Sequence, residues 1–334
     1  MNIGVVGAGS WGTALADLLA RNGHQVTLWA YEADLVARMR QTHENDLFLP
    51  GIRLHDKLGF TDSLAVVAQG RELLLLVSPS QLMRLVFRKL LPDLDDGTVL
   101  VSAAKGIENQ TLMTMSQVLE EELEHAGRKA DLAFLSGPSF AREVALGLPT
   151  AVVAASEKEA VAELVQQVFS GERFRVYTND DVIGIEFGGA LKNVMALAAG
   201  IADGLGFGAN TRAALITRGL SEMTRLGVAA GACPQTFAGL AGMGDLVLTC
   251  TGDLSRNRTV GLELGRGRSL QDILGGMNMV AEGVKTTIST YQLAARLQVE
   301  APITEQVYKI LEEGKDPRQA VTDLLQRSLK AEVQ

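Results

Sequence analysis

The sequence predicts an α/β protein whose N-terminal part is a doubly wound parallel sheet and whose C-terminal part is mainly α-helical. Two observations support this fold class. Up to about residue 177, short apolar runs alternate with amphipathic helical patterns, which is typical of strand–helix–strand units. From about residue 181 onward, strand-like runs are rare, and alanine, leucine and methionine recur at helical spacing. We therefore expect two domains, at residues 1–183 and 184–334.

The first strand is expected at residues 3–6, a short β-branched run that suits a buried parallel strand. Gly7, Gly9 and Gly12 follow with the spacing G-x-G-x-x-G, and a helical pattern begins at residue 13. In a Rossmann-type domain the first glycine permits the tight turn, the second lets a pyrophosphate approach the backbone, and the third lets the helix pack close to the strand. The N-terminal N–H groups of that helix then face the phosphates. The sequence therefore predicts a Rossmann-type dinucleotide-binding domain.

The later elements follow the same alternation. Further strands are expected at residues 25–29, 73–77, 98–102, 132–135, 150–154 and 173–177, with helices at 33–42, 81–91, 111–126 and 157–169. The second domain should hold helices at 183–201, 212–230, 256–264, 284–297, 304–313 and 317–329. Ligands of doubly wound sheets bind beyond the carboxyl ends of the strands. The loops that begin near Ser78, Lys105 and Ser136 should therefore lie in the same crevice as the glycine-rich turn.

The composition disfavours several kinds of partner. The chain has 334 residues, with 31 Lys and Arg against 39 Asp and Glu, and a net charge of −8 argues against nucleic acid. The longest apolar runs are far too short to cross a bilayer, and no leader pattern precedes the first strand, so we expect neither membrane insertion nor a signal peptide. Cys233 and Cys250 are the only cysteines, which predicts no disulfide framework, no metal site and a cytoplasmic location.

Lys192 is the candidate base. Oxidation of an alcohol by hydride transfer needs a group that accepts the hydroxyl proton, and none of the 4 histidines lies in a glycine-rich or strand-end loop. A lysine whose pKa is lowered by burial can take this role. Lys192 follows two glycines among small and apolar residues, although the same pattern also fits a lysine on the exposed face of an amphipathic helix. Lys105 is a second candidate cation.

Residues 251–259 form a candidate phosphate site. Ser255 is a good N-cap for the helix that follows, and it would place backbone N–H donors beside Arg256, Asn257 and Arg258. Such a combination suits a phosphate dianion better than a carboxylate. A capped, solvated helix start explains the same pattern equally well.

Asp245 is the candidate acidic residue, because it lies in a glycine-flanked turn from which it can accept hydrogen bonds from substrate hydroxyls. Its alternative role is that of a helix N-cap or an ordinary turn residue. Other catalytic classes leave little trace, since neither an H-E-x-x-H motif nor a G-x-x-x-x-G-K-[ST] phosphate loop occurs. Residues 137–141 lack the final glycine of a G-x-S-x-G nucleophile elbow. Metalloenzyme, NTPase and hydrolase readings are therefore disfavoured.

Several motifs resemble the bacterial NAD(P)-dependent sn-glycerol-3-phosphate dehydrogenases along nearly the whole chain. They are GAGSWGTA at 7–14, KG at 105–106, SGPSFA at 136–141, KN at 192–193, ANTR at 209–212, GMGD at 242–245 and SRNR at 255–258. The resemblance implies reversible hydride transfer between the cofactor and C2 of glycerol 3-phosphate, giving dihydroxyacetone phosphate. It also implies an all-helical second domain and a homodimer that supplies glycerol 3-phosphate for phospholipid synthesis.

The resemblance assigns roles to individual residues. Lys192 would be the proton acceptor. The substrate would be held by Lys192 together with Lys105, Gly137, Ser139, Asp245, Ser255, Arg256 and Asn257. The cofactor would meet the glycine-rich turn together with Ser10, Trp11, Lys105, Ala141, Arg256, Val280 and Glu282.

The position that selects the cofactor departs from the family. At the end of the second strand the family often has His or Arg, whereas this chain has Tyr31 followed by Glu32. An acid there binds the ribose 2′-OH, and an arginine binds a 2′-phosphate. With the neutral Tyr31 in the selector position, we expect both NAD and NADP to be accepted.

Two other functions remain as alternatives. A β-hydroxyacid dehydrogenase shares the two-domain plan and a lysine base, but it acts on a carboxylate and has no need of a phosphate site at Ser255–Arg258. A dinucleotide sensor without catalysis would not need Lys192, Lys105 and Asp245 together. The dehydrogenase of glycerol 3-phosphate is therefore the favoured reading.

Overall fold

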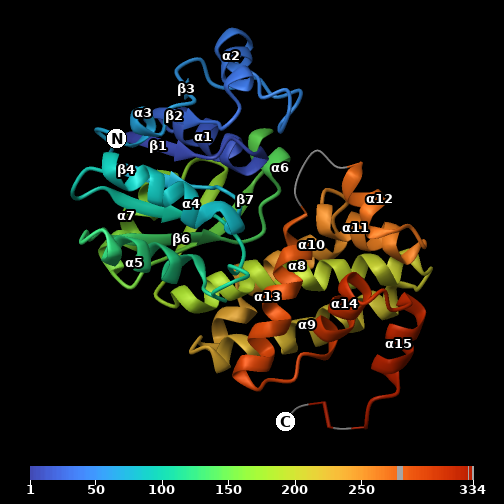
Figure 1. Cartoon of the computed structure of the whole chain (residues 1–334). Helices are drawn as coiled ribbons and strands as arrows, with labels where there is room; N and C mark the ends of the chain where they lie inside the picture. The colour runs from blue at the N-terminus through green and yellow to red at the C-terminus, as the bar shows by residue number, and fades with distance from the viewer. Residues whose placement is uncertain (277–280, 330, 333–334) are drawn as a thin grey trace.

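The computed structural model describes residues 1–276, 281–329 and 331–332. Its first half is an eight-stranded sheet in the order β3-β2-β1-β4-β5-β6-β7-β8, with helices on both faces (Figure 1). The strands are β1 (Asn2–Val6), β2 (Gln25–Trp29), β3 (Gly59–Thr61), β4 (Leu73–Leu76), β5 (Val99–Ser102), β6 (Leu132–Ser136), β7 (Thr150–Ala155) and β8 (Phe174–Asn179). The helices are α1 (Ser10–Arg21), α2 (Ala33–Thr42), α3 (Leu64–Ala68), α4 (Ser80–Leu90), α5 (Met115–His125), α6 (Ala141–Ala145) and α7 (Glu159–Phe169).

Every predicted strand is present, and the Rossmann-type arrangement is confirmed. Because side chains alternate between the faces of a strand, neighbouring residues feed different cores. Val5 and Leu75 join the apolar cluster on one face of the sheet, and Val6 and Leu76 join the cluster on the other. Both faces are therefore buried, which explains why the central strands are continuous apolar runs.

The predicted parallel sheet has one antiparallel pairing, between β6 and β7, where Phe134 lies opposite Ala155, and β8 then pairs parallel with β7. A parallel connection needs a crossover of about a dozen residues or more, usually a full helix. Here residues 137–149 hold only the five-residue helix α6, and the chain turns back directly. The three-residue strand β3 at the sheet edge was not predicted, because it lies in a polar loop without an apolar run.

The second half of the described chain is helical, as predicted. Its helices are α8 (Val182–Gly204), α9 (Ala209–Ala229), α10 (Asp245–Thr251), α11 (Arg256–Gly265), α12 (Leu270–Gly275), α13 (Glu282–Leu297), α14 (Pro302–Glu312) and α15 (Pro317–Leu325). The short helices α3, α6, α10 and α12 were not predicted, since they span too few residues to show a period. The expected domain boundary after residue 183 falls in the first turn of α8, and the division into two domains stays a prediction.

Helix α8 runs through the middle of the helical half (Figure 1), and it contacts β6, β7, α9, α10, α11 and α13. Among the described residues it is the one helix long and apolar enough to cross a bilayer, yet 83% of that stretch is buried inside the protein. Its apolar surface is therefore that of a core helix, and the third apolar cluster is built around it.

Glu186 of α8 connects this core helix to the sheet half. Its carboxylate accepts hydrogen bonds from Ser116 N at 2.9 Å and from Ser116 Oγ at 2.6 Å, both in the first turn of α5. Burial raises the pKa of Glu186 to about 7, against the hydrogen bonds from Ser116, which lower it. A helix start has N–H groups without intrahelical partners, so Glu186 completes α5 from a distant part of the chain.

Candidate active site

The glycine-rich turn between β1 and α1 has the backbone geometry that its sequence requires. Gly7 has φ +121°, a conformation that side chains other than glycine rarely adopt. A Cβ on Gly12 would lie 1.9 Å from the carbonyl oxygen of Gly7, so the helix packs directly on the turn. A Cβ on Gly9 would meet nothing within 4 Å. The turn is therefore tight at both ends and open in the middle, where a phosphate would approach.

The start of α1 offers donors to such a phosphate. Gly9 is its N-cap and makes no side-chain cap, so the first N–H groups, beginning at Ser10, are left for a ligand. Trp11 Nε1 is buried and has no hydrogen-bond partner within the described part of the chain. A buried donor of this kind needs an acceptor. The open turn, the uncapped helix and the waiting donor together fit a bound dinucleotide.

Residues 30–37, which follow β2 directly, contain no arginine that could bind a 2′-phosphate. Tyr31 is 83% exposed and Glu32 is half-buried at the start of α2. The next arginine, Arg38, pairs with Asp34 at 2.7 Å and with Asp46 at 2.9 Å. The selector position is therefore occupied by a neutral, exposed tyrosine, with the carboxylate of Glu32 next to it and the nearest following arginine already paired.

The loops after the central strands meet at one edge of the sheet, as predicted. Val77 N donates to Val6 O at 2.9 Å, and Ala103 N donates to Leu76 O at 2.9 Å. These bonds continue the pairing of β1, β4 and β5 into the loops that carry Ser78 and Lys105. The strand-end residues are thus brought to the same side as the glycine-rich turn.

Lys192, Asp245 and Lys105 form one ionic cluster in which two ammonium groups share a carboxylate. Lys192 Nζ donates to Asp245 Oδ1, and Lys105 Nζ donates to Asp245 Oδ2 at 2.7 Å. The exposed fractions of the three side chains are 9%, 1% and 14% for Lys192, Asp245 and Lys105. Lys105 Nζ also donates to Gly137 O at 3.1 Å, and Ser139 Oγ donates to the same carbonyl at 3.0 Å. Residues from α8, α10 and two strand-end loops therefore converge.

The environment of Lys192 changes its acid–base chemistry. Burial lowers its pKa to about 7, and the charge of Lys105 lowers it too, while Asp245 acts in the opposite direction. The two preceding glycines make this burial possible. A Cβ on Gly188 would lie 2.5 Å from Ala241 O, and one on Gly189 would lie 2.7 Å from Ser136 Oγ. Lys192 therefore lies on a packed face of α8, where an amine can gain or lose a proton near neutral pH.

The flanking glycines predict a simple turn at Asp245, but the structure shows the start of a helix there. Asp245 begins α10 directly after a π-helical turn (Leu240–Gly244). Thr249 Oγ1 donates to Asp245 O at 2.6 Å, four residues along the same helix. π-Helical turns are rare and are frequently found at functional sites.

The Ser255–Arg258 run begins α11, and the predicted cap is present. Ser255 Oγ accepts from Arg258 N at 3.3 Å. The two arginines differ: Arg258 pairs with Asp203 at 2.9 Å and with Asp253 at 3.0 Å, whereas Arg256 is exposed and makes no ion pair with the described residues. Two carboxylates thus already hold the guanidinium of Arg258, which agrees with a substrate set that includes Arg256 and leaves out Arg258. Arg256 remains the cation available to a ligand.

Asn257 forms a buried chain of amides with Asn193. Its Nδ2 donates to Asn193 Oδ1 at 2.9 Å, and its Oδ1 accepts from Gly283 N at 3.0 Å. Asn193 follows Lys192 on α8, so this chain links the candidate base to the start of α13. No role for Asn193 was predicted, although a polar residue inside an apolar helix was a visible signal. Ser136 Oγ was also missed; it is buried beside Gly189 without a partner in the described residues.

Glu282 is the first residue of α13, and it lies near the same cluster. Burial raises the pKa of its carboxyl, while the charges of Arg256, Lys105 and Lys192 and the backbone of Ser80 lower it. These groups place Glu282 where α13 meets the strand-end loops. Ala141 begins α6 and, like Trp11, packs against the core of the sheet half. Val280, expected to meet the cofactor, lies outside the described residues.

A Rossmann-type sheet with an open glycine-rich turn, joined to a helical half that supplies a buried lysine of lowered pKa, defines a nicotinamide-dependent dehydrogenase. Two family models locate it within that class. The N-terminus of NAD-dependent glycerol-3-phosphate dehydrogenase matches residues 2–162, and the C-terminus of the same enzyme matches residues 181–322. The chain belongs to the NAD-dependent glycerol-3-phosphate dehydrogenase family.

Individual relatives agree with this assignment. The chain is 66% identical over 333 residues to glycerol-3-phosphate dehydrogenase (NAD(P)+) of Syntrophotalea carbinolica, covering 100% of both chains. It is 65% identical to the protein of the same name from Geobacter sulfurreducens, covering 99% of this chain and 98% of the relative. Among solved structures it resembles glycerol-3-phosphate dehydrogenase from Coxiella burnetii, with a TM-score of 0.94, 43% identity and coverage of 98% and 99% of the two chains.

Proposed function

We propose that this enzyme catalyses reversible hydride transfer between C2 of sn-glycerol 3-phosphate and NAD or NADP, giving dihydroxyacetone phosphate. The observation that carries the proposal is the cluster in which Lys192 and Lys105 share the carboxylate of Asp245. It combines a proton carrier near neutral pH with an excess of positive charge, at the edge of the sheet where the cofactor would bind. The family and the names of the relatives support the same reaction.

Lys192 is the proposed proton carrier. In the direction of oxidation its neutral amine accepts the proton of the C2 hydroxyl, and in reduction its ammonium returns a proton to the carbonyl oxygen. When bound, the nicotinamide accepts or supplies the hydride. A pKa of about 7 suits both directions, because the amine and the ammonium are then both populated at neutral pH.

The remaining substrate contacts follow from position. Lys105 and Asp245 would orient the C1 and C2 oxygens, with Gly137 and Ser139 beside them. Arg256 and the capped start of α11, with Ser255 and Asn257, would hold the phosphate. The guanidinium of Arg256 makes no ion pair with the described residues, which favours the glycerol 3-phosphate reaction over that of a β-hydroxyacid dehydrogenase. The carboxylate substrate of the latter needs no second anion site.

The cofactor would be held by the sheet half and by the start of α13. Gly7, Gly9 and Gly12 with the first N–H groups of α1 would meet the pyrophosphate. Ser10, Trp11, Tyr31, Lys105, Ala141, Arg256 and Glu282 complete the proposed set within the described residues. Because Tyr31 is neutral and Arg38 is already paired, both NAD and NADP should be used.

We also propose that the enzyme is a cytoplasmic homodimer that supplies glycerol 3-phosphate for phospholipid synthesis. Cys233 and Cys250 are both free thiols, which agrees with a reducing compartment. Sedimentation of the purified protein measures the assembly directly, and a mass of one chain would contradict the dimer.

One assay tests the proposed reaction. Oxidation of NADH and of NADPH is followed in the presence of dihydroxyacetone phosphate, with unphosphorylated dihydroxyacetone and a 3-keto acid as comparison substrates. We expect turnover of dihydroxyacetone phosphate with both cofactors. Turnover of the keto acid alone would assign the chain to the β-hydroxyacid dehydrogenases, and binding without any turnover would support a sensor.

A further inference from the structure

The loop between β5 and α5 carries Lys105 to the site. Residues 103–114 contain neither helix nor strand, and the hydrogen bonds within the loop backbone, from Glu108 N to Met113 O and from Leu112 N to Glu108 O, both 2.9 Å, join only its second half. Lys105 lies near the start of this loop, and its Nζ contacts Asp245 Oδ2 at 2.7 Å. The position of the Lys105 ammonium therefore depends on whatever fixes the loop.

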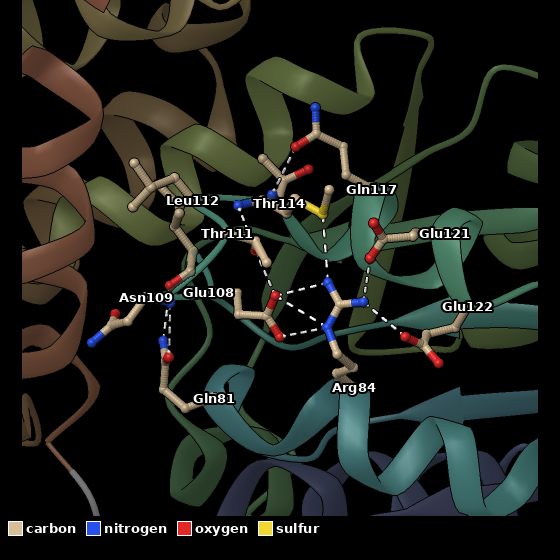
Figure 2. A network of polar contacts seen from close by, with 12 residues as sticks. Gln81, Arg84, Glu108, Asn109, Thr111, Leu112, Thr114, Gln117, Glu121 and Glu122 are labelled. Carbon is tan, nitrogen blue, oxygen red and sulfur yellow. Dashed lines mark hydrogen bonds and ion pairs between the residues drawn. The ribbon is translucent and has the colours of Figure 1, made fainter. Parts of the chain in front are cut away.

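Two side chains of α4 fix it from one side (Figure 2). Gln81 Nε2 donates to Ile107 O at 2.8 Å, and its Oε1 accepts from Asn109 N at 3.0 Å, as a neighbouring strand would. Arg84 lies one turn further along α4. Its guanidinium donates to Glu108 through Nε at 2.9 Å and through Nη2 at 2.8 Å, so the ion pair is bidentate. A bidentate pair fixes direction as well as distance.

Arg84 is itself held by α5. Its Nη1 donates to Glu122 Oε1 at 2.7 Å and also to Glu121 (Figure 2). The exposed fractions are 18% for Arg84, 11% for Glu108 and 2% for Glu122. One guanidinium, largely shielded from water, thus connects the loop to the helix that follows it. On the site side, a Cβ on Gly106 would lie 2.3 Å from Ser80 Oγ, so the loop also packs on the start of α4.

We propose that Gln81 and Arg84 are positioning residues for Lys105: by fixing residues 107–109 against α4, they set the Lys105 ammonium against Asp245. The inference rests on the proposed function, in which Lys105 and Asp245 serve the substrate. Neither Gln81 nor Arg84 touches the ionic cluster, and both act through the loop.

The proposal predicts a change in acid–base behaviour that loss of stability alone would not cause. The charged and titratable groups that act on Lys192 are Asp245 and Cys250 on α10, Lys105 on the loop and Glu282 on α13. Of these, Lys105 is the positive one, and its charge lowers the pKa of Lys192. If the loop is released, Lys105 moves away and the pKa of Lys192 rises. The pH at which oxidation of glycerol 3-phosphate reaches half its maximum should then increase.

Arg88 provides a matched control. It lies one turn after Arg84 on α4 and pairs with the same Glu122, at 2.6 Å, but it makes no hydrogen bond to residues 103–114 in the described structure. We expect Arg84→Met to lower kcat/KM for dihydroxyacetone phosphate by about 10- to 100-fold, the scale of a small misplacement in a site. The midpoint of the pH profile should rise in the same variant. Arg88→Met should leave both quantities unchanged.

A second variant covers the case in which Arg84→Met does not fold. Glu108→Gln keeps the shape of the side chain and removes its charge, and it should produce the same upward shift of the profile. Unchanged kcat/KM and unchanged profiles in both variants would overturn the positioning role, as would an equal loss in Arg88→Met. Lys105→Met distinguishes the role of Lys105 in the site from the role of the residues that position it. If Lys105→Met retains full activity, the proposed role of Lys105 fails. If it is inactive while the Arg84 and Glu108 variants are normal, only the positioning role fails.

Discussion

The Lys192 cluster is shielded from water throughout, whereas the Arg84 cluster is buried at Glu122 and exposes Arg88 at its edge, and the charge balance of the two clusters is opposite. The first has two ammonium groups on one carboxylate. The second has two guanidinium groups among three carboxylates, formed by Arg84, Arg88, Glu108, Glu121 and Glu122. In the first, burial lowers the pKa of Lys192 to about 7. In the second, the hydrogen bond from Arg88 lowers the pKa of Glu122 to about 2.

This difference separates a cluster that can react from one that holds structure. A buried lysine in a cluster with fewer carboxylates than cations titrates near neutral pH and attracts an anionic ligand. Carboxylates and guanidiniums that satisfy one another stay ionised through the whole physiological range and can only hold geometry. The charge balance, more than the number of ion pairs, indicates where chemistry takes place.

The first variant removes the proposed proton carrier of the Lys192 cluster, and we expect the largest effect from it. Lys192→Ala should lower kcat by roughly 100- to 10,000-fold, the usual contribution of a general base, while the fold and cofactor binding persist. Steady-state kinetics measure kcat, circular dichroism measures whether the fold persists, and a fluorescence titration measures cofactor binding. Activity within a few-fold of the parent would remove Lys192 from this role.

The second variant tests the attraction of anions. Arg256→Ala should raise KM for dihydroxyacetone phosphate and reduce its preference over unphosphorylated dihydroxyacetone by about 10- to 150-fold, since a charge-assisted hydrogen bond is worth about 1.5–3 kcal/mol. The ratio of kcat/KM for the two substrates is the measurement. If that ratio does not change, Arg256 does not bind the phosphate.

The third variant tests the structural cluster. The pKa of Glu122 is lowered from 4.5 to about 2, so its ionised form stabilises the fold at neutral pH and this contribution is lost as pH falls through that window. Glu122→Gln should therefore lower the free energy of unfolding by roughly 1–3 kcal/mol at neutral pH. Denaturation by urea at several pH values measures the difference, which should shrink toward pH 2. A difference independent of pH would argue against an electrostatic role.

The smallest effect is expected at the cofactor selector. Tyr31→Arg adds a cation where the parent has a neutral, exposed ring, and it should shift preference toward NADPH. Values of kcat/KM for both cofactors on parent and variant measure the shift. If the parent enzyme prefers NADPH by more than about 100-fold, close to 3 kcal/mol, a group other than Tyr31 must bind the 2′-phosphate.

The sheet half was the more predictable part of the molecule. Its buried strands are apolar runs of the right length, and the spacing of Gly7, Gly9 and Gly12 has a local mechanical cause, so both could be read from the residues. The direction of β7 could not, because it depends on how the chain folds back after Ser136. The start of α10 was missed for a similar reason, since the π-helical turn before Asp245 has no local signature.

The site itself was predictable in residue type more than in arrangement. Lys192 stood out by its neighbours, but the pattern could not decide between an exposed and a buried face of α8. The spacing of the residues alone also left open whether Arg256 or Arg258 faces a ligand, and only the family resemblance named Arg256 by itself. In the structure Arg258 is paired with Asp203, which lies 55 residues before it. Contacts of such long range leave no periodic signal in one sequence.

Glu186 has a further consequence for how the protein melts. Because the first turn of α5 is completed by a carboxylate on α8, neither helix can leave its place without stripping hydrogen bonds from the other. We therefore expect the sheet half and the helical half to unfold together, in a single calorimetric transition. A ligand that binds only beside Lys192 would then protect the strands as well, and its stabilisation would grow with the logarithm of its concentration.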